Sequence, residues 1–318
     1  MKKFVLSVAA AMMLAAPAFA ADMPVKAKKV VVAPNPWEIA IGAAVVSDYN
    51  FRGISQSNRQ PSFWAYVEPR YNIAPNLQVY AGVAYETIRF PNNARSEVDF
   101  YAGVRPTLGP VAFDFGLWYY YYPGGTTFNG LGAATTCTNG FFSLGACNVM
   151  KSDVSFLEIY GKATYNVTDA IALGLNVFYD PNWLNTGAAG TYVSGTAKYT
   201  LPSTMFPADW GAYVSAELGH YWLGTTDAFY AVPAFPAGVN LPDYTTWNLG
   251  VGFTYKILTL DLRYYDTDLS RGKCNVLTGD HTATFNAGAV STINPSGLTS
   301  RWCGPAFIAK LAVDYVIK

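Results

Sequence analysis

The stretch VSDYNFRGISQS, residues 46–57, places a carboxylate and a guanidinium among aromatic and aliphatic side chains. Asp48 and Arg52 are four residues apart, and because such a spacing spans about 13 Å of extended chain, they cannot pair with each other directly. Each charged group must find a partner elsewhere or stay hydrated. Where they face water, charges of both signs can sort ions and polar solutes.

Catalytic residue types are scarce by comparison. A hydrolase that acts on membrane lipid needs a Ser–His pair or its equivalent where the protein meets the membrane surface. The chain has only two histidines, His220 and His281. His220 falls on the lipid-facing side of a predicted strand, beside Trp222, and this position suits an interfacial belt. His281 lies in a long predicted loop. No GxSxG, HExxH or phosphate-binding glycine loop is present, so we expect no enzyme, metal or cofactor.

The four cysteines form two local pairs. Cys137 and Cys147 lie in one predicted long loop, and Cys274 and Cys303 lie in another. Of the three possible connectivities, this placement favours 137–147 and 274–303. Closing the second loop, of about thirty residues, should restrict its conformations by a few kcal/mol in the chain-entropy model. The Cys and His spacings do not suit a metal site, so we predict two structural disulfides.

Composition indicates the kind of fold that carries these residues. Charged residues make up only 13% of the chain, against roughly 25% in soluble proteins, while aromatic residues reach 16%. Even so, no stretch after residue 20 approaches the roughly 20 apolar residues of a spanning helix. A membrane protein without such helices must be a closed barrel, because lipid offers backbone groups no hydrogen bonds.

Period-2 alternation predicts the strands of this barrel. In LTLDLRYYD, for example, Leu258 and Leu260 lie on one face and Asp261 and Arg263 on the other. About twelve strands are predicted by this pattern, over residues 37–52, 61–72, 77–89, 96–107, 110–122, 153–166, 170–180, 191–201, 210–223, 244–256, 258–267 and 305–317. Short links alternate with longer ones, as in outer-membrane barrels with short periplasmic turns and long extracellular loops. We therefore predict an all-β, antiparallel up-and-down transmembrane barrel over residues 37–318.

The same alternation predicts which side chains meet lipid and which face the lumen. The lipid face of the first strand carries Trp37, Ile39, Ile41, Val45, Tyr49 and Phe51, the last two in the outer aromatic girdle. The predicted acidic lumen residues are Glu38, Asp48, Glu68, Glu86, Asp99, Asp114, Glu158, Glu217, Asp261 and Asp314. The basic ones are Arg52, Arg70, Arg105, Lys162, Lys198, Arg263 and Lys310. The lumen is also predicted to be narrowed by Tyr66, Tyr80, Tyr101, Trp118 and Tyr160.

The opening stretch also carries a family likeness. VSDYNFRGISQS, followed by PSFWAYVEPRY, resembles the start of the TorF-like porins, also called the Gcw_chp family. The likeness is sharpest from Ser47 to Gln56 and continues from Trp37 onward as alternating aromatic strands. It implies an integral outer-membrane barrel of a Gram-negative bacterium, with membrane lipid and the barrel-assembly machinery as partners and an unknown solute. Such barrels usually end on an aromatic residue, whereas this chain ends Val316-Ile317-Lys318, with Tyr315 nearby.

The first twenty residues have the three parts of a secretory signal peptide. Lys2 and Lys3 precede an apolar stretch, and Ala18-Phe19-Ala20 forms the cleavage site. Residues 21–36 are predicted to be a periplasmic leader. Because the whole chain has 21 basic and 21 acidic residues, removal of the two lysines leaves a slightly negative protein without a basic patch for nucleic acid.

We expect N-terminal sequencing of protein taken from the outer membrane to begin at Ala21, because the A-x-A site lies directly before it. A mature chain that starts upstream of Ala21 would contradict this cleavage site.

Two interpretations of the lumen charges lead to different functions. In the first, a polar pore passes small hydrophilic solutes with a weak cation preference, because acidic residues outnumber basic ones. In the second, the charges pair across a plugged barrel that acts as a receptor, an adhesin or a structural protein. Loop aromatics such as YYYYPGGTTFNG, from Tyr119, could stack on sugars, although an interfacial girdle requires the same residues. The charge pattern favours the conducting pore.

Overall fold

The computed structural model describes residues 36–132 and 147–318. The predicted signal peptide, residues 1–20, lies outside the described residues, as do Cys137 and all of the predicted leader except Pro36. Within the described ranges, no helix is both long and apolar enough to cross a membrane.

Twelve antiparallel strands close into one barrel, as the sequence predicts. Their bounds are β1 (Trp37–Val46), β4 (Ser62–Ala74), β5 (Leu77–Thr87), β6 (Ser96–Leu108), β7 (Val111–Tyr121), β10 (Phe156–Asn166), β11 (Ile171–Asp180), β12 (Gly190–Thr200), β13 (Trp210–Leu223), β14 (Tyr244–Tyr255), β15 (Leu258–Thr267) and β18 (Ala306–Ile317). Neighbours in the sheet follow chain order, and the ladder between β1 and β18 closes the barrel, running from Ile39 opposite Ile317 to Val46 opposite Lys310. Closure removes every open strand edge that lipid would leave unsatisfied.

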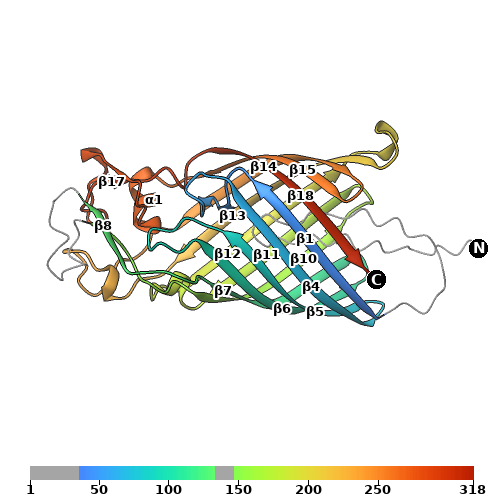
Figure 1. Ribbon diagram of the computed structural model, residues 1–318, viewed down its shortest axis with the longest axis horizontal. Helices are drawn as coiled ribbons and strands as arrows, with labels where there is room; N and C mark the ends of the chain where they lie inside the picture. Colours follow the sequence, from blue (N-terminus) through green and yellow to red (C-terminus); the bar gives the residue numbers. More distant parts are fainter. Residues whose placement is uncertain (1–35, 133–146) are drawn as a thin grey trace, which may run out of the picture.

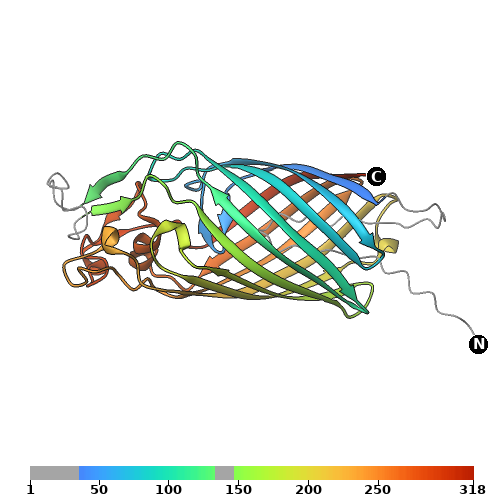
Figure 2. The same ribbon diagram turned by 90° about the horizontal axis from the view of Figure 1, so that it is seen from below.

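The two ends of the barrel differ in the length of their connections. Short turns gather at one end with the carboxyl terminus, and long loops extend from the other end (Figures 1 and 2). One of the turns contains Gly109, whose φ of +60° suits a tight hairpin connection. The loop end carries β2 (Asn50–Phe51), β3 (Ile54–Ser55), β8 (Phe128–Gly132), β9 (Cys147–Met150), α1 (Arg271–Thr278), β16 (Thr284–Phe285), β17 (Leu298–Thr299) and 3-10 helices at Trp183–Asn185, Ala228–Tyr230 and Ala287–Ala289. One more 3-10 helix, Ser203–Met205, lies in the longest link of the turn end.

Alternation along the strands gives the barrel an apolar outer surface. On β15 the outward residues Leu258, Leu260 and Leu262 are exposed, and this is the arrangement expected of side chains that meet lipid. Aromatic pairs mark both rims: Trp37 packs on Tyr71 at the turn end, with ring centroids 4.9 Å apart, and Tyr264 packs on Phe307 at the loop end. The outer surface therefore has the apolar band and aromatic girdles of an outer-membrane barrel.

One of the two predicted disulfides is confirmed. Cys274 on α1 is bonded to Cys303, which comes shortly before β18, with 5.8 Å between their Cα atoms. This bond attaches α1 to the end of the last loop. The other predicted bond, Cys137–Cys147, involves Cys137, which lies outside the described residues.

The predicted end of the first strand, at residue 52, is wrong. β1 ends at Val46, and after Ser47 donates its N–H to the carbonyl of Ala309 the chain leaves the wall. Tyr49 and Phe51, predicted to face lipid, are instead buried, at 1% and 9% exposure. The alternation of apolar and polar residues continues through this segment. Its apolar side chains no longer face lipid, however, because the backbone turns into the lumen.

Candidate functional site: the barrel lumen and its inserted hairpin

The segment that leaves the wall, residues 47–60, folds back as a hairpin inside the barrel; we call it the inserted hairpin. β2 and β3 form its two short arms. Arg52 and Gly53, with φ of +48° and +87°, form its tip. A Cβ atom on Gly53 would lie only 2.3 Å from Cγ2 of Thr267 on β15, so glycine is required where the tip meets the wall.

Arg52 anchors the tip of the inserted hairpin across the lumen. Its guanidinium forms two hydrogen bonds to the carboxylate of Glu158 on β10, at 2.6 and 3.0 Å. The aromatic rings within about 5 Å of its Cζ atom belong to Phe51, Phe178, Tyr192 and Tyr221. Glu158 is fully buried, and a buried ion pair of this kind is costly to break from one side.

Further contacts hold the base of the inserted hairpin. Tyr49 donates its hydroxyl to Glu97 on β6 at 2.5 Å. Asp48 forms an ion pair with Arg59 at 2.9 Å, and the Arg59 guanidinium also donates to the backbone carbonyls of Arg301, Trp302 and Gly304. The hairpin is therefore attached both to the wall and to the loop that carries the disulfide. Asp48 and Arg52 lie inside the barrel, on this hairpin rather than on the wall strand that was predicted to carry them.

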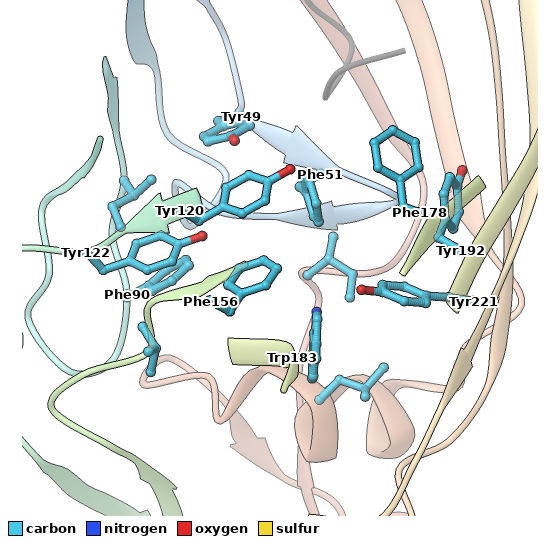
Figure 3. Close-up of a cluster of buried hydrophobic side chains, with 14 of the residues drawn as sticks. Tyr49, Phe51, Phe90, Tyr120, Tyr122, Phe156, Phe178, Trp183, Tyr192 and Tyr221 are labelled. Atoms are coloured by element: carbon cyan, nitrogen blue, oxygen red, sulfur yellow. The ribbon is translucent and has the colours of Figure 1, made fainter. Parts of the chain in front are cut away.

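Aromatic side chains surround the inserted hairpin and fill the loop end of the lumen (Figure 3). Tyr120 stacks on Phe156 with ring centroids 4.5 Å apart, and Trp183 meets Tyr221 edge to face. A cavity of about 30 Å³ lies beside Phe51, and another of about 20 Å³ separates the hairpin from Asp261 and Arg263. Each is large enough for about one or two water molecules.

The predicted wall charges lie on the inward side of their strands. Most are buried, namely Glu68, Glu86, Asp99, Asp114, Glu158, Asp261, Asp314, Arg105, Lys162, Lys198 and Lys310. Those of intermediate exposure are Glu38, Arg70, Glu217 and Arg263. The predicted inward aromatics Tyr80, Tyr101, Trp118 and Tyr160 are buried as well, and Tyr66 is half-buried, with its hydroxyl donating to Asp314.

Arg105 is the centre of one group of wall charges. Its guanidinium donates to both carboxylate oxygens of Glu68, at 2.7 and 3.2 Å, and to Asp114 at 3.2 Å. It also lies over the Tyr80 ring, with Cζ 3.6 Å from the centroid. Arg70 adds a third hydrogen bond to Glu68, at 2.6 Å. Two buried acids thus share one buried guanidinium. Without it, Asp114 would lose its ion pair and Glu68 would keep only the contact with Arg70.

A second group of charges lies on the far wall, next to the inserted hairpin. Arg263 and Asp261 on β15 form an ion pair at 2.9 Å. Arg263 also donates to Asn248 and Ser215, both at 2.7 Å, and Tyr213 donates to Asp261 at 2.9 Å. Because both charges lie on one strand and face the same cavity, neutralising one leaves the other as a net charge at that cavity.

Alternation alone also missed residues that contribute to the lumen. Glu97 and Asp180 are buried inward-facing acids, and Arg59 pairs with Asp48. Glu97 has the same strand parity as Asp99, so the period-2 pattern could have found it. The position of Arg59 could not be predicted from alternation, because Arg59 lies in a loop and reaches Asp48 only after that loop folds inward.

The two histidines lie apart from the lumen charges. On the outer face, the ring of His220 lies 4.5 Å from that of Trp222, and its Nδ1 shares a hydrogen bond with the Thr245 hydroxyl. In the last loop, His281 meets Trp302 edge to face at 5.7 Å. Burial lowers the pKa of His281 below its ordinary value, so its ring is neutral at pH 7.

A family model described as a bacterial protein of unknown function, Gcw_chp, matches residues 31–293. The chain belongs to the Gcw_chp family. The string from Ser47 to Gln56, where the sequence resembles this family most sharply, coincides with the inserted hairpin. In this member of the Gcw_chp family, the segment therefore lies across the lumen of the closed twelve-stranded β-barrel. A search of curated proteins finds no match.

Several solved outer-membrane barrels are similar to this Gcw_chp chain in fold. The KdgM porin is 9% identical, with 88% of this chain and 99% of that chain covered and a TM-score of 0.39. The NanC porin is also 9% identical, with 87% and 98% covered and a TM-score of 0.40. OmpT of Vibrio cholerae is 10% identical, with 88% and 96% covered and a TM-score of 0.38. At identities of 9–10% and TM-scores of 0.38–0.40, no property of these proteins is carried over to this chain.

Proposed function

We propose that the protein is a narrow, porin-like channel of the outer membrane for small hydrophilic solutes, with the inserted hairpin as its constriction. The observation that carries this proposal is the insertion of residues 47–60 into a lumen whose wall bears charges of both signs. Side chains can fill a barrel of eight strands, whereas sixteen leave an open aqueous channel. Twelve strands lie between these limits, so a folded-in segment can set the width of the passage.

The way the inserted hairpin is attached supports a movable constriction. Its arms hydrogen-bond to each other, and side chains hold its tip to the wall through the pair of Arg52 with Glu158. The twelve-stranded ladder is complete without it. Displacing the tip therefore breaks an ion pair and aromatic contacts but leaves the backbone hydrogen bonds of the barrel in place.

The charges of the lumen support a weak preference for cations. Near the loop end the buried acids are Glu86, Glu97, Asp99, Glu158 and Asp180. Arg52 is the basic residue that the inserted hairpin brings to this group, through Glu158. Low-dielectric walls concentrate such an excess of negative charge into a field that a permeating ion meets.

Charge-neutralising variants of β15 should change the ion selectivity in opposite directions. Asp261→Asn removes the acidic charge of this pair and should weaken the cation preference, whereas Arg263→Gln removes the basic charge and should strengthen it. Reversal potentials under a salt gradient measure the shift, which should fade as ionic strength rises, because the screening length is about 10 Å at 0.1 M. Arg271→Ala, on the exposed surface of α1, is the control. Unchanged selectivity in both β15 variants would show that this pair does not face the permeation path.

Solute flux into liposomes tests the proposed function itself. Vesicles that contain the refolded protein should swell in small sugars or amino acids at a low but measurable rate, whereas protein-free vesicles should not. The small cavities beside the inserted hairpin favour a second candidate, a non-conducting barrel that presents its loops as a receptor, an adhesin or a structural surface. Folded protein that gives no swelling with any small solute would favour that second candidate.

A further inference from the structure

Three carboxylates gather near the loop end of the lumen, apart from the ion pairs described above. Glu86 on β5 lies directly opposite Glu97 on β6, and Asp99 follows two residues later on the same face of β6. One carboxylate oxygen from each residue lies within 4.8 Å of the other two. All three side chains are buried, with at most 1% exposure. We call these residues the acidic triad.

The acidic triad differs from the ion-paired acids of the lumen in lacking a basic partner. Glu68 pairs with Arg105, Glu158 with Arg52. Among the described residues, no lysine, arginine or histidine forms an ion pair with Glu86, Glu97 or Asp99. Like charges directly opposite each other on neighbouring strands are destabilising, so this arrangement needs a compensating positive charge.

Carboxylate oxygens without hydrogen-bond partners indicate what compensates the negative charge of the acidic triad. Oε2 of Glu86 and both carboxylate oxygens of Asp99 are buried without a hydrogen-bond partner. Buried polar atoms are nearly always partnered in folded proteins, and an isolated buried carboxylate carries a large desolvation cost. Three such oxygens in one enclosed cluster point to a ligand that supplies positive charge.

We propose that Glu86, Glu97 and Asp99 bind a divalent cation, with Ca²⁺ as the ion that their chemistry suits best. The donors are all carboxylate oxygens, which select hard cations, and the triad offers up to about six of them where Ca²⁺ takes 6–8. Mg²⁺ keeps several of its water molecules and fits a buried site less well. A metal was not expected from the sequence, because the Cys and His spacings do not suit a metal site and Glu97 was not among the predicted lumen residues.

This cation would also fasten the inserted hairpin. Glu97 accepts the hydroxyl hydrogen of Tyr49 at 2.5 Å, so an ion held by Glu97 fixes the acceptor of a hairpin contact. The site lies on two wall strands and exists whether or not the barrel conducts. A bound ion would offset part of the negative charge near the loop end, so the test of this site is independent of whether the barrel conducts but not of its cation preference.

Terbium luminescence in the refolded full-length protein tests the site. Tb³⁺ occupies Ca²⁺ sites and emits when a nearby indole is excited, and Trp64 lies directly opposite Glu86 in the register of β4 and β5. We expect saturable emission that Ca²⁺ displaces, and at least tenfold weaker binding in Asp99→Asn and in Glu97→Gln. The matched control is Glu217→Gln, a lumen acid that already has hydrogen bonds from Tyr192 and Asn248; this variant should bind as the wild type does.

Thermal unfolding separates a bound cation from bound protons. Ca²⁺ should raise the thermal unfolding midpoint of the wild type by several degrees over its value in chelator. The midpoint of Asp99→Asn should be the same in Ca²⁺ and in chelator. If Asp99→Asn does not fold, Glu86→Gln provides the same comparison. Tb³⁺ emission that is equal in wild type and both triad variants would overturn the proposal, because the ion would then bind elsewhere. An unfolding midpoint of the wild type that does not respond to Ca²⁺ would overturn it as well and would leave shared protons as the compensating charge.

Discussion

Replacing Arg52 with alanine is expected to raise solute flux through the barrel at least tenfold. The wild-type guanidinium bonds to Glu158 at 2.6 and 3.0 Å inside an aromatic cage, and breaking a buried pair from one side costs about 3–5 kcal/mol. If the pair forms only while the inserted hairpin closes the lumen, its loss shifts the ratio of open to closed barrels by more than about 100-fold. Flux is limited by that ratio and should rise with it.

The measurement is the swelling rate of liposomes that contain equal amounts of folded protein. Arg271→Ala removes an arginine from the exposed surface of α1 and should swell at the wild-type rate. The double variant Arg52→Ala/Glu158→Gln removes the uncompensated carboxylate and should keep the raised flux while restoring thermal stability. A folded Arg52→Ala protein with wild-type flux would show that the Arg52 contact does not hold the passage closed.

Replacing Arg105 with methionine should lower the free energy of unfolding by about 3–5 kcal/mol. Methionine keeps much of the packing on Tyr80 but removes the donors that bind Glu68 and Asp114. Two buried carboxylates then lose their shared guanidinium. Urea titration of the barrel refolded in detergent or lipid, followed by tryptophan fluorescence, measures the change.

Arg70→Met is the matched control for this effect. Arg70 also binds Glu68, at 2.6 Å, but its side chain is 15% exposed compared with 4% for Arg105. We expect it to cost no more than about 1 kcal/mol, the value of roughly one hydrogen bond, because Glu68 keeps both hydrogen bonds from Arg105. Equal destabilisation by the two substitutions would mean that burial of Arg105 does not determine the strength of its ion pairs.

Much of the barrel could be predicted from sequence because the side chains of each wall strand alternate between the lipid and the lumen. In β15, leucines alternate with Thr259, Asp261 and Arg263, and the predicted bounds 258–267 are those of the structure. Lipid on one side and a polar lumen on the other impose this pattern on every wall strand. Strand number, connection lengths and the inward direction of the wall charges follow from it.

The inserted hairpin could not be predicted in the same way. Tyr49 and Phe51 continue the alternation of β1, and nothing local shows that the backbone leaves the wall after Ser47. The contact that draws the segment inward joins Arg52 to Glu158, 106 positions away, so it depends on the closed barrel. The acidic triad was missed for a related reason: alternation can give the facing of Glu86, Glu97 and Asp99 but not the cross-strand register that brings Glu97 opposite Glu86.

Single-channel recording in planar bilayers tests most directly whether the inserted hairpin is the constriction of a channel. The wild type is compared with a variant in which residues 48–59 are replaced by a short Gly-Ser turn, so that the wall strands β1 and β4 keep their sequences. We predict small conductance steps for the wild type and steps several-fold larger for the shortened protein. Steps of equal size, or a folded shortened barrel that conducts no current, would contradict the account.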